Sequence, residues 1–314
     1  MDGMQHIVGR NVRSHSDAVV TQRTLKTSIA CVGVGLHSGK RVNMHLYPAP
    51  IDHGIVFRRT DLGRDIPARF DRVVDTRLCT VLAGDDTAAR IGTVEHILAA
   101  LAGLGIGNVL IELDGPEVPI LDGSAREFLF LLECAGLVDQ DEARRVIEVR
   151  RTVRVGDVNA WAELRPLAGA PAPTLHMDIA IDFTAAAIGR QSASISLTPT
   201  SFRQELAGAR TFAMMAEVEQ MQAAGLALGG SLDNAIVVDD DHILNPGGLR
   251  MEAEFARHKL LDAVGDLALA GAALHGVFTA YRSGHALNNQ LLRALLADPT
   301  AWRLLDAAPI AVAA

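Results

Sequence analysis

Two segments of this chain follow the same order: an apolar helix, a break that contains glycine, and a β-strand. The first is TVEHILAALAGLGIGNVLIEL (residues 93–113), and the second is FARHKLLDAVGDLALAGAALHGVFTAYRSG (residues 255–284). Each carries a histidine near the front of its helix, His96 and His258. This order predicts an α+β fold with two halves that face each other. Chance similarity between two apolar helices is the alternative, because the repeat is weak residue by residue.

The length of 314 residues exceeds that of an ordinary single domain, so we expect two domains. We place the boundary in the charged stretch DQDEARR. This divides the chain into an N-terminal extension (1–22), a first α+β domain (23–143) and a second α+β domain (144–314).

Composition restricts the classes of partner and compartment. A net charge of −8 argues against nucleic acid as the main partner. The chain has no uninterrupted apolar run of about 18 residues, and its N-terminus lacks a long apolar core. We therefore expect no membrane span and no secretory signal, so membrane contact would be peripheral at most. The cysteines are few, far apart and without a CxxC pair, which favours a reducing, cytoplasmic location.

Local patterns predict individual elements. Residues 27–49 indicate a strand, a glycine-rich turn and a second strand, and residues 54–61 and 75–83 indicate further strands. In SAREFLFLLECAGL, Ser124 and Glu127 have the spacing of a capping box, and Gly136 marks the end of the helix. Strands resume from residue 144, and a short helix is expected in EVEQMQAAGLALGG.

The stretch RHKLLDAVGD places ionisable side chains on an otherwise apolar helix. His258, Asp262 and Asp266 are four residues apart in turn and therefore share one face. A solvated stripe with a His–Asp pair is the more frequent explanation for such spacing. Half of a metal site is the alternative, because a carboxylate and an imidazole near a core need a partner.

Glu95 and His96 strengthen the explanation that the stripe is half of a metal site. One histidine from one helix and a His-x-x-x-Asp pair from another would supply two nitrogens and one oxygen, leaving a fourth position open as catalytic zinc requires. Glu95 could then reach the bound water as general base. The simpler alternative is a polar helix start, because a glutamate in the first turn suits the helix dipole.

Two further stretches place polar groups beside glycine or apolar residues. In SGHALNNQ, His285 follows a strand on an expected loop, where it could donate a proton or stabilise charge. In ARTF, Thr211 could donate a hydrogen bond to a developing oxyanion. A solvated histidine and a strand-end threonine are the respective alternatives.

Together these stretches resemble the UDP-3-O-acyl-N-acetylglucosamine deacetylase (LpxC) family of lipid A synthesis. The matching stretches run in the family's order over roughly residues 22–305: GVGLHSGK, VVDTRLCT (73–80), TVEHILAAL, PILDGSA, ARTF, LGGSLDNAIVVDD, RHKLLDAVGD and SGHALNNQLL (283–292). The combination of TVEH, HKLLD and GHALNN is highly specific to that family.

The resemblance implies roles for particular residues. One Zn²⁺ per chain would be held by His96, His258 and Asp262. The remaining implied roles are general base for Glu95, cationic proton donor for His285, orientation of that histidine for Asp266, polarisation of the acyl carbonyl for Thr211, and substrate contact for Lys259.

The resemblance also implies the architecture and the substrate. Two similar domains would each form a sheet layer with helices, the helices would lie between the sheets, and the active site would lie between the domains. An insert around residues 211–240 would form an apolar passage for an acyl chain, lined by Phe212, Met215, Val218, Leu226, Leu228 and Ala235. Core packing is the alternative role for these side chains.

The implied activity is hydrolysis of the N-acetyl group of UDP-3-O-acyl-N-acetylglucosamine, the committed step of lipid A (lipopolysaccharide) synthesis in Gram-negative bacteria. We expect a cytoplasmic, monomeric enzyme. The alternatives are a metal amidohydrolase acting on another N-acyl sugar, and a non-catalytic protein that binds acylated nucleotide sugars.

Overall fold

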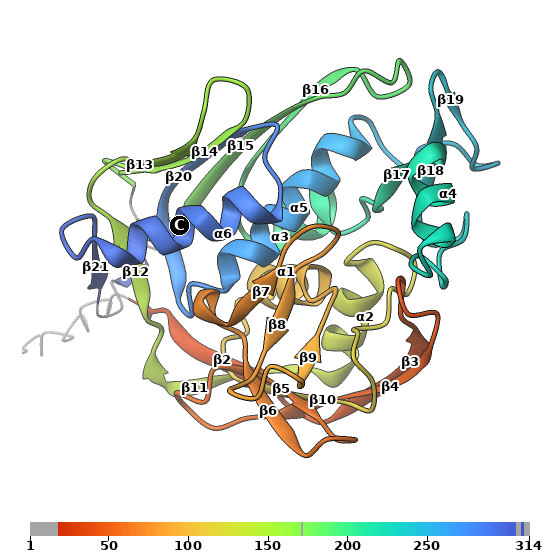
Figure 1. The fold of residues 1–314 in the computed structure, drawn as a ribbon. Coiled ribbons are helices and arrows are strands. Elements are labelled where there is room, and N and C mark those ends of the chain that lie inside the picture. The colour runs from red at the N-terminus through yellow and green to blue at the C-terminus, as the bar shows by residue number, and fades with distance from the viewer. Residues whose placement is uncertain (1–17, 171, 306–308, 311–314) are drawn as a thin grey trace, which may run out of the picture.

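Two β-sheets form outer layers, and the main helices lie between them (Figure 1). The computed structural model describes residues 18–170, 172–305 and 309–310. One hydrophobic cluster runs from the sheets through the helices and includes Ile111, Leu98, Leu261 and Phe278. The expected α+β class, with helices sandwiched between sheets, is confirmed. None of the helices in the described residues is long and apolar enough to cross a membrane.

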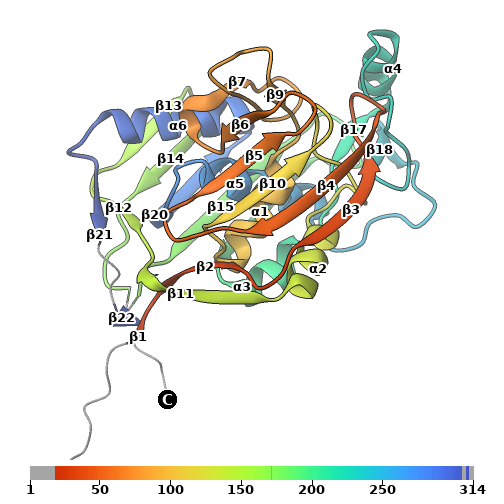
Figure 2. The ribbon, with the colours of Figure 1, turned by 90° about the horizontal axis from the view of Figure 1, so that it is seen from below.

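The first sheet is built from the N-terminal half and faces the viewer in Figure 2. Its strand order is β3-β4-β10-β5-β6. β10 lies at its centre, antiparallel to β4 and parallel to β5. The predicted alternation is present on β4, where Val42, Met44 and Leu46 are buried. The strand bounds are β3 Ile29–Val34, β4 Arg41–Pro48, β5 Ile55–Arg59, β6 Arg64–Pro67 and β10 Val109–Leu113.

The second sheet comes from the C-terminal half and is organised around β20. β20 pairs in parallel with β12 and β15 and antiparallel with β14. Thus β10 and β20, the strands that follow the two apolar helices, both occupy central positions. The strand bounds are β12 Val146–Val149, β13 Val153–Gly156, β14 Trp161–Arg165, β15 Leu175–Asp182, β16 Arg190–Ser196, β20 Ala273–Tyr281 and β21 Trp302–Leu305.

Four smaller sheets complete the strand pairing. They are β1 Ala18–Val19 with β22 Pro309–Ile310, β2 Thr21–Leu25 with β11 Leu137–Ala143, β7 Val73–Asp75 with β8 Val81–Ala83 and β9 Arg90–Ile91, and β17 Phe212–Met214 with β18 Ile236–Asp239 and β19 His242–Ile243. Of the expected N-terminal extension, residues 1–17 lie outside the described residues, and residues 18–22 include β1 and the start of β2. The boundary after residue 143 separates β11 from β12 and stays a prediction.

The continuous strand predicted over residues 75–83 is wrong in its middle. Residues 76–80 separate β7 from β8. The carboxylate of Asp75 accepts a hydrogen bond from the backbone N–H of Arg77 at 3.1 Å, and such a local bond favours a turn over an extended strand. The turn frees the backbone of the following residues for other partners.

The helices that matter most for the site are α1 and α5, which pack against each other between the sheets (Figure 1). The helix bounds are α1 Glu95–Leu104, α2 Arg126–Ala135, α3 Pro199–Ser201, α4 Met215–Ala223, α5 Glu254–Ala268 and α6 His285–Ala297, with a 3-10 turn at Phe70–Arg72 and a π-helical turn at Phe202–Leu206. α1 ends at Gly105, whose φ of +73° favours a residue without Cβ.

The predicted capping box at the start of α2 is absent. The residue that precedes the helix is Ala125, and Ser124 Oγ accepts a hydrogen bond from Arg126 N at 3.1 Å instead of from Glu127 N. The hydroxyl of Ser124 also donates a hydrogen bond to the carboxylate of Asp122 at 2.7 Å, which holds it in the turn before the helix. The predicted end is confirmed, because Gly136 follows the helix with φ of +72°.

Candidate metal centre

Three buried side chains converge where α1 and α5 meet. α1 supplies His96, and α5 supplies His258 and Asp262. Asp262 Oδ1 lies 3.6 Å from His96 Nε2 and 3.3 Å from His258 Nε2. One ligand atom from each residue can be chosen so that all lie within 4.8 Å of one another, and each residue is at most 3% exposed. The two helices therefore bring together the trio that the sequence indicated.

This trio fits a metal ion. Asp262 Oδ1 is buried and forms no hydrogen bond within the described residues, although a buried carboxylate oxygen needs a partner. His258 Nδ1 lies 3.1 Å from the carbonyl oxygen of Ala209, and donation to that oxygen leaves Nε2 as the ligating nitrogen. Burial lowers the pKa of His258 to about 4, so the imidazole is neutral, as metal binding requires.

Asp262 is ionised in this setting. Burial by itself would raise the pKa of its carboxyl group, but His258 and Lys259 outweigh that effect and hold the pKa well below its usual value. Lys259 Nζ donates a hydrogen bond to Asp262 Oδ2 at 2.9 Å. The lysine thus occupies one carboxylate oxygen and leaves Oδ1 facing the two histidines.

Glu95 and His285 form a second group beside the trio. Glu95 Oε1 lies 3.7 Å from His285 Nε2. Burial raises the pKa of Glu95, although His285 and His96 oppose this effect, and a raised pKa suits a proton acceptor near neutral pH. His285 is not on a loop, as the sequence suggested, but is the first residue of α6. Residues 282–284 connect the end of β20 to that helix, and the last of them, Gly284, has an extended backbone.

Asp266 lies outside the metal trio and binds His285 instead. Its Oδ2 is 2.8 Å from His285 Nδ1. Burial disfavours the charged imidazole, but the carboxylates of Asp266 and Glu95 outweigh burial and raise the pKa of His285 to about 10. Asp266 also accepts hydrogen bonds from Thr80 Oγ1 at 2.6 Å and Asn288 Nδ2 at 2.8 Å. Sequence reasoning assigned no role to these two residues, although both lie in the stretches that carried the family resemblance.

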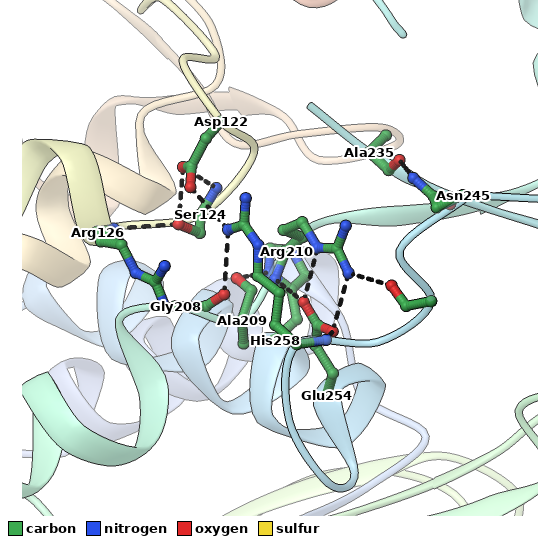
Figure 3. A network of polar contacts seen from close by, with 12 residues as sticks. Asp122, Ser124, Arg126, Gly208, Ala209, Arg210, Ala235, Asn245, Glu254 and His258 are labelled. Atoms are coloured by element: carbon green, nitrogen blue, oxygen red, sulfur yellow. Dashed lines mark hydrogen bonds and ion pairs between the residues drawn. The ribbon is translucent and has the colours of Figure 1, made fainter. Parts of the chain in front are cut away.

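A buried ion pair anchors the segment that carries Thr211 (Figure 3). Arg210 Nε donates to Glu254 Oε1 at 2.9 Å, and the backbone N–H of Arg210 donates to the same oxygen at 3.1 Å. Glu254 is the first residue of α5 and is fully buried. The pair fixes Ala209 and Thr211 next to the helix that carries His258. Nothing in the local pattern around Glu254 marked it as a partner for residue 210.

The sequence of this chain matches known proteins over most of its length. The sequence model of the family described as UDP-3-O-acyl N-acetylglycosamine deacetylase (LpxC) matches residues 22–297. This chain belongs to the LpxC family. A UDP-3-O-acyl-N-acetylglucosamine deacetylase from Shewanella woodyi is 48% identical over 300 residues, covering 93% of this chain and 96% of that protein. A protein of the same name from Mannheimia succiniciproducens is 50% identical over 291 residues, covering 91% and 93% respectively.

In this member of the LpxC family, two neighbouring cavities surround the site. The smaller, of about 90 Å³, contains the metal trio together with Glu95 and His285. The larger has a volume of about 1070 Å³ and a mostly apolar lining around α4 and β18. Both are lined by Leu36, His37, Leu78, Cys79, Thr211, Phe212 and Lys259. Thr211 and Lys259 therefore lie where the two cavities meet.

Most of the side chains expected in the apolar passage line the larger cavity: Phe212, Val218, Leu226 and Ala235. Met215 and Leu228 are not among the lining residues, and Met214 lines the cavity instead. All three residues of β17, Phe212–Met214, line the cavity, whereas Met215 already begins α4. Leu228 is 57% exposed, and its backbone N–H donates to His37 O at 3.3 Å.

Proposed function

We propose that this chain hydrolyses the N-acetyl group of UDP-3-O-acyl-N-acetylglucosamine, releasing acetate and UDP-3-O-acyl-glucosamine, the committed step of lipid A synthesis. The observation that carries the proposal is the arrangement around one small cavity. A buried His–His–Asp trio lies beside a carboxylate, Glu95, and a charged imidazole, His285, whose facing atoms are 3.7 Å apart. Such a set suits metal-assisted amide hydrolysis.

We assign the trio to one Zn²⁺. Two imidazole nitrogens and one carboxylate oxygen form the donor set of catalytic zinc, and His258 has the outer hydrogen bond that orients such a ligand. When bound, zinc would polarise the amide carbonyl and lower the pKa of a coordinated water to roughly 7.

The protein's own groups perform the proton transfers. Glu95 accepts a proton from the attacking water, and the raised pKa of its carboxyl group suits this step. His285 enters as an imidazolium, stabilises the developing oxyanion and gives its proton to the leaving nitrogen as the C–N bond breaks. Asp266 keeps that imidazole charged and oriented. Thr211 donates a hydrogen bond to the carbonyl oxygen. General acid–base help of this kind contributes about 10²–10⁴-fold.

The large apolar cavity favours an acylated substrate over other N-acyl sugars. Its volume of about 1070 Å³ is at the upper end of ligand pockets. We assign the acyl chain to the part lined by Phe212, Val218, Leu226 and Ala235, and a substrate contact to Lys259. We also propose a monomer in the cytoplasm with at most peripheral membrane contact, consistent with three free cysteines.

Acetate release tests the proposal. Purified protein is assayed with UDP-3-O-acyl-N-acetylglucosamine and with UDP-N-acetylglucosamine, which lacks the acyl chain, before and after chelation and zinc addition. We expect release from the acylated substrate that chelation abolishes and zinc restores. Equal rates with both substrates would favour an amidohydrolase of broader N-acyl sugar range. Binding without release would indicate a non-catalytic binding protein.

The acid–base assignment has its own test. Glu95→Gln and His285→Ala should each lower kcat by about 10²–10⁴-fold while the protein keeps its metal, since neither residue belongs to the trio. Metal analysis and single-turnover kinetics measure the two quantities separately. Near-normal kcat in either variant would overturn that residue's role.

A further inference from the structure

Thr80 contacts both acidic residues that flank His285. Its backbone N–H donates to Glu95 Oε2 at 3.1 Å, and its hydroxyl donates to Asp266 Oδ1 at 2.6 Å. Asp266 Oδ2 and Glu95 Oε1 in turn face the two nitrogens of His285, at 2.8 and 3.7 Å. The four residues form a closed ring in which each contacts the next. Thr80 is 2% exposed and reaches neither the metal trio nor the large cavity.

The ring joins elements that are distant in sequence. Thr80 lies between β7 and β8, Glu95 begins α1, and Asp266 lies on α5, 186 residues from Thr80. Thr80 supplies both donors, and it directly precedes Val81, which pairs with Asp75 at the start of β8. The spacing between the two carboxylates is therefore tied to a third element.

Thr80 and His285 bind different oxygen atoms of the Asp266 carboxylate. A carboxylate can rotate, and its two oxygens are chemically equivalent until a donor distinguishes them. Among the described residues, Thr80 is the hydrogen-bond donor to Asp266 Oδ1, whereas Asn288 and His285 both bind Oδ2. Asn288 therefore cannot replace the threonine hydroxyl.

We propose that Thr80 is a positioning residue that aims one oxygen of Glu95 and one of Asp266 at His285. It fixes the direction of proton acceptance and donation without touching substrate or metal. This inference rests on the proposed function, because the ring acts on the groups assigned to the proton transfers.

Thr80→Val tests the hydroxyl, because valine keeps the shape and the backbone N–H. We expect kcat to fall about 10- to 100-fold, the usual effect of losing a hydrogen bond to a charged group, with KM and metal content unchanged. Thr80→Ser keeps the hydroxyl and should retain most of the wild-type kcat. The matched control is Thr24→Val, which removes another buried hydroxyl, bonded to Asn108 O at 2.7 Å and remote from the site. It should leave kcat unchanged.

A double-mutant cycle tests whether Thr80 acts through Asp266. In an Asp266→Asn background, Thr80→Val should lower kcat by less than about 3-fold, because the carboxylate that it orients is gone. A full, additive loss would contradict the inference, as would Thr80→Val with normal kcat or Thr80→Ser as impaired as Thr80→Val.

A readout independent of turnover separates this inference from the proposed function. In protein labelled with ¹⁵N-histidine, the Nδ1–H of His285 should give a downfield proton signal that His285→Ala removes. We expect the signal in the wild type, Thr80→Ser and Thr24→Val, and its shift or broadening in Thr80→Val. A wild type without acetate release would refute the proposed function but leave this comparison informative. An unchanged signal in Thr80→Val would refute the inference alone.

Discussion

Gly265 on α5 lies directly against the backbone of Glu95 on α1. A Cβ at position 265 would stand 2.0 Å from the carbonyl oxygen of Glu95, a distance that no packing tolerates. The absence of a side chain therefore lets the two helices approach closely at the residue next to His96. This approach brings His96 within 3.6 Å of Asp262.

Gly265→Ala should force α1 and α5 apart. We expect a loss of about 1–3 kcal/mol in the free energy of unfolding, as for other overpacked cores, together with weaker metal binding. Chemical denaturation and metal titration measure the two effects. The control is Gly107→Ala, where an added Cβ meets no atom within 4 Å. Unaltered metal affinity in Gly265→Ala would show that the helix spacing does not set the site.

Removal of the metal should destabilise the fold as well as stop the reaction. A ligand that binds only the folded state contributes about 4 kcal/mol at a thousand times its dissociation constant. We therefore expect chelation to lower the melting temperature in calorimetry and zinc to restore it. His96→Ala should show the low melting temperature with or without zinc. A chelation-sensitive melting temperature in that variant would place the metal elsewhere.

The pH profile should report the pair of His285 and Asp266. The imidazolium is present below its pKa of about 10 and is lost as the pH rises through that value, so kcat should fall on the alkaline side. By linkage, the pair's contribution to stability is complete below about pH 6.5, the ordinary pKa of histidine, and disappears as the pH rises through about 10.

Asp266→Asn removes the carboxylate that raises the pKa of His285 most, and leaves the smaller contributions of Glu95 and Asp262. The alkaline limb of the kcat profile should therefore move to lower pH. A series of kcat measurements between pH 5 and 11 on both proteins, each saturated with zinc, checks the direction. A limb that stays in place would assign the alkaline ionisation to another group.

Arg210→Met should be strongly destabilising, because it leaves the fully buried Glu254 without its charged partner. Breaking such a pair costs about 3–5 kcal/mol. The same substitution at Arg58, whose pairing with Asp65 is half exposed, should cost less than about 1 kcal/mol. Arg210→Met should also weaken metal binding by about 10–100-fold, because Ala209 O orients His258. Equal costs for both variants would contradict the assigned importance of burial.

Much of the site could be predicted because it depends on short spacings. Four residues along a helix bring side chains to one face, so His258 and Asp262 were recognisable as a pair before their surroundings were known. The alternation of Val42, Met44 and Leu46 on β4 and the helix end at Gly136 were also predictable from neighbouring residues. Glu95–His96 and His285 stood out in their own stretches, but no local spacing connects these stretches with α5, and the family resemblance assigned them to one site.

The sequence by itself determined which residues are ionisable, which share a helix face and where the central helices end, because these properties depend on neighbours along the chain. Only the tertiary structure decided which side chains from other segments contact each helix face. Asp266 has the same spacing from Asp262 as Asp262 has from His258, yet it binds His285 and Thr80 and not the trio. That difference arises where α1, α5, α6 and the residue before β8 come together, and contacts between distant segments have no local period to reveal them.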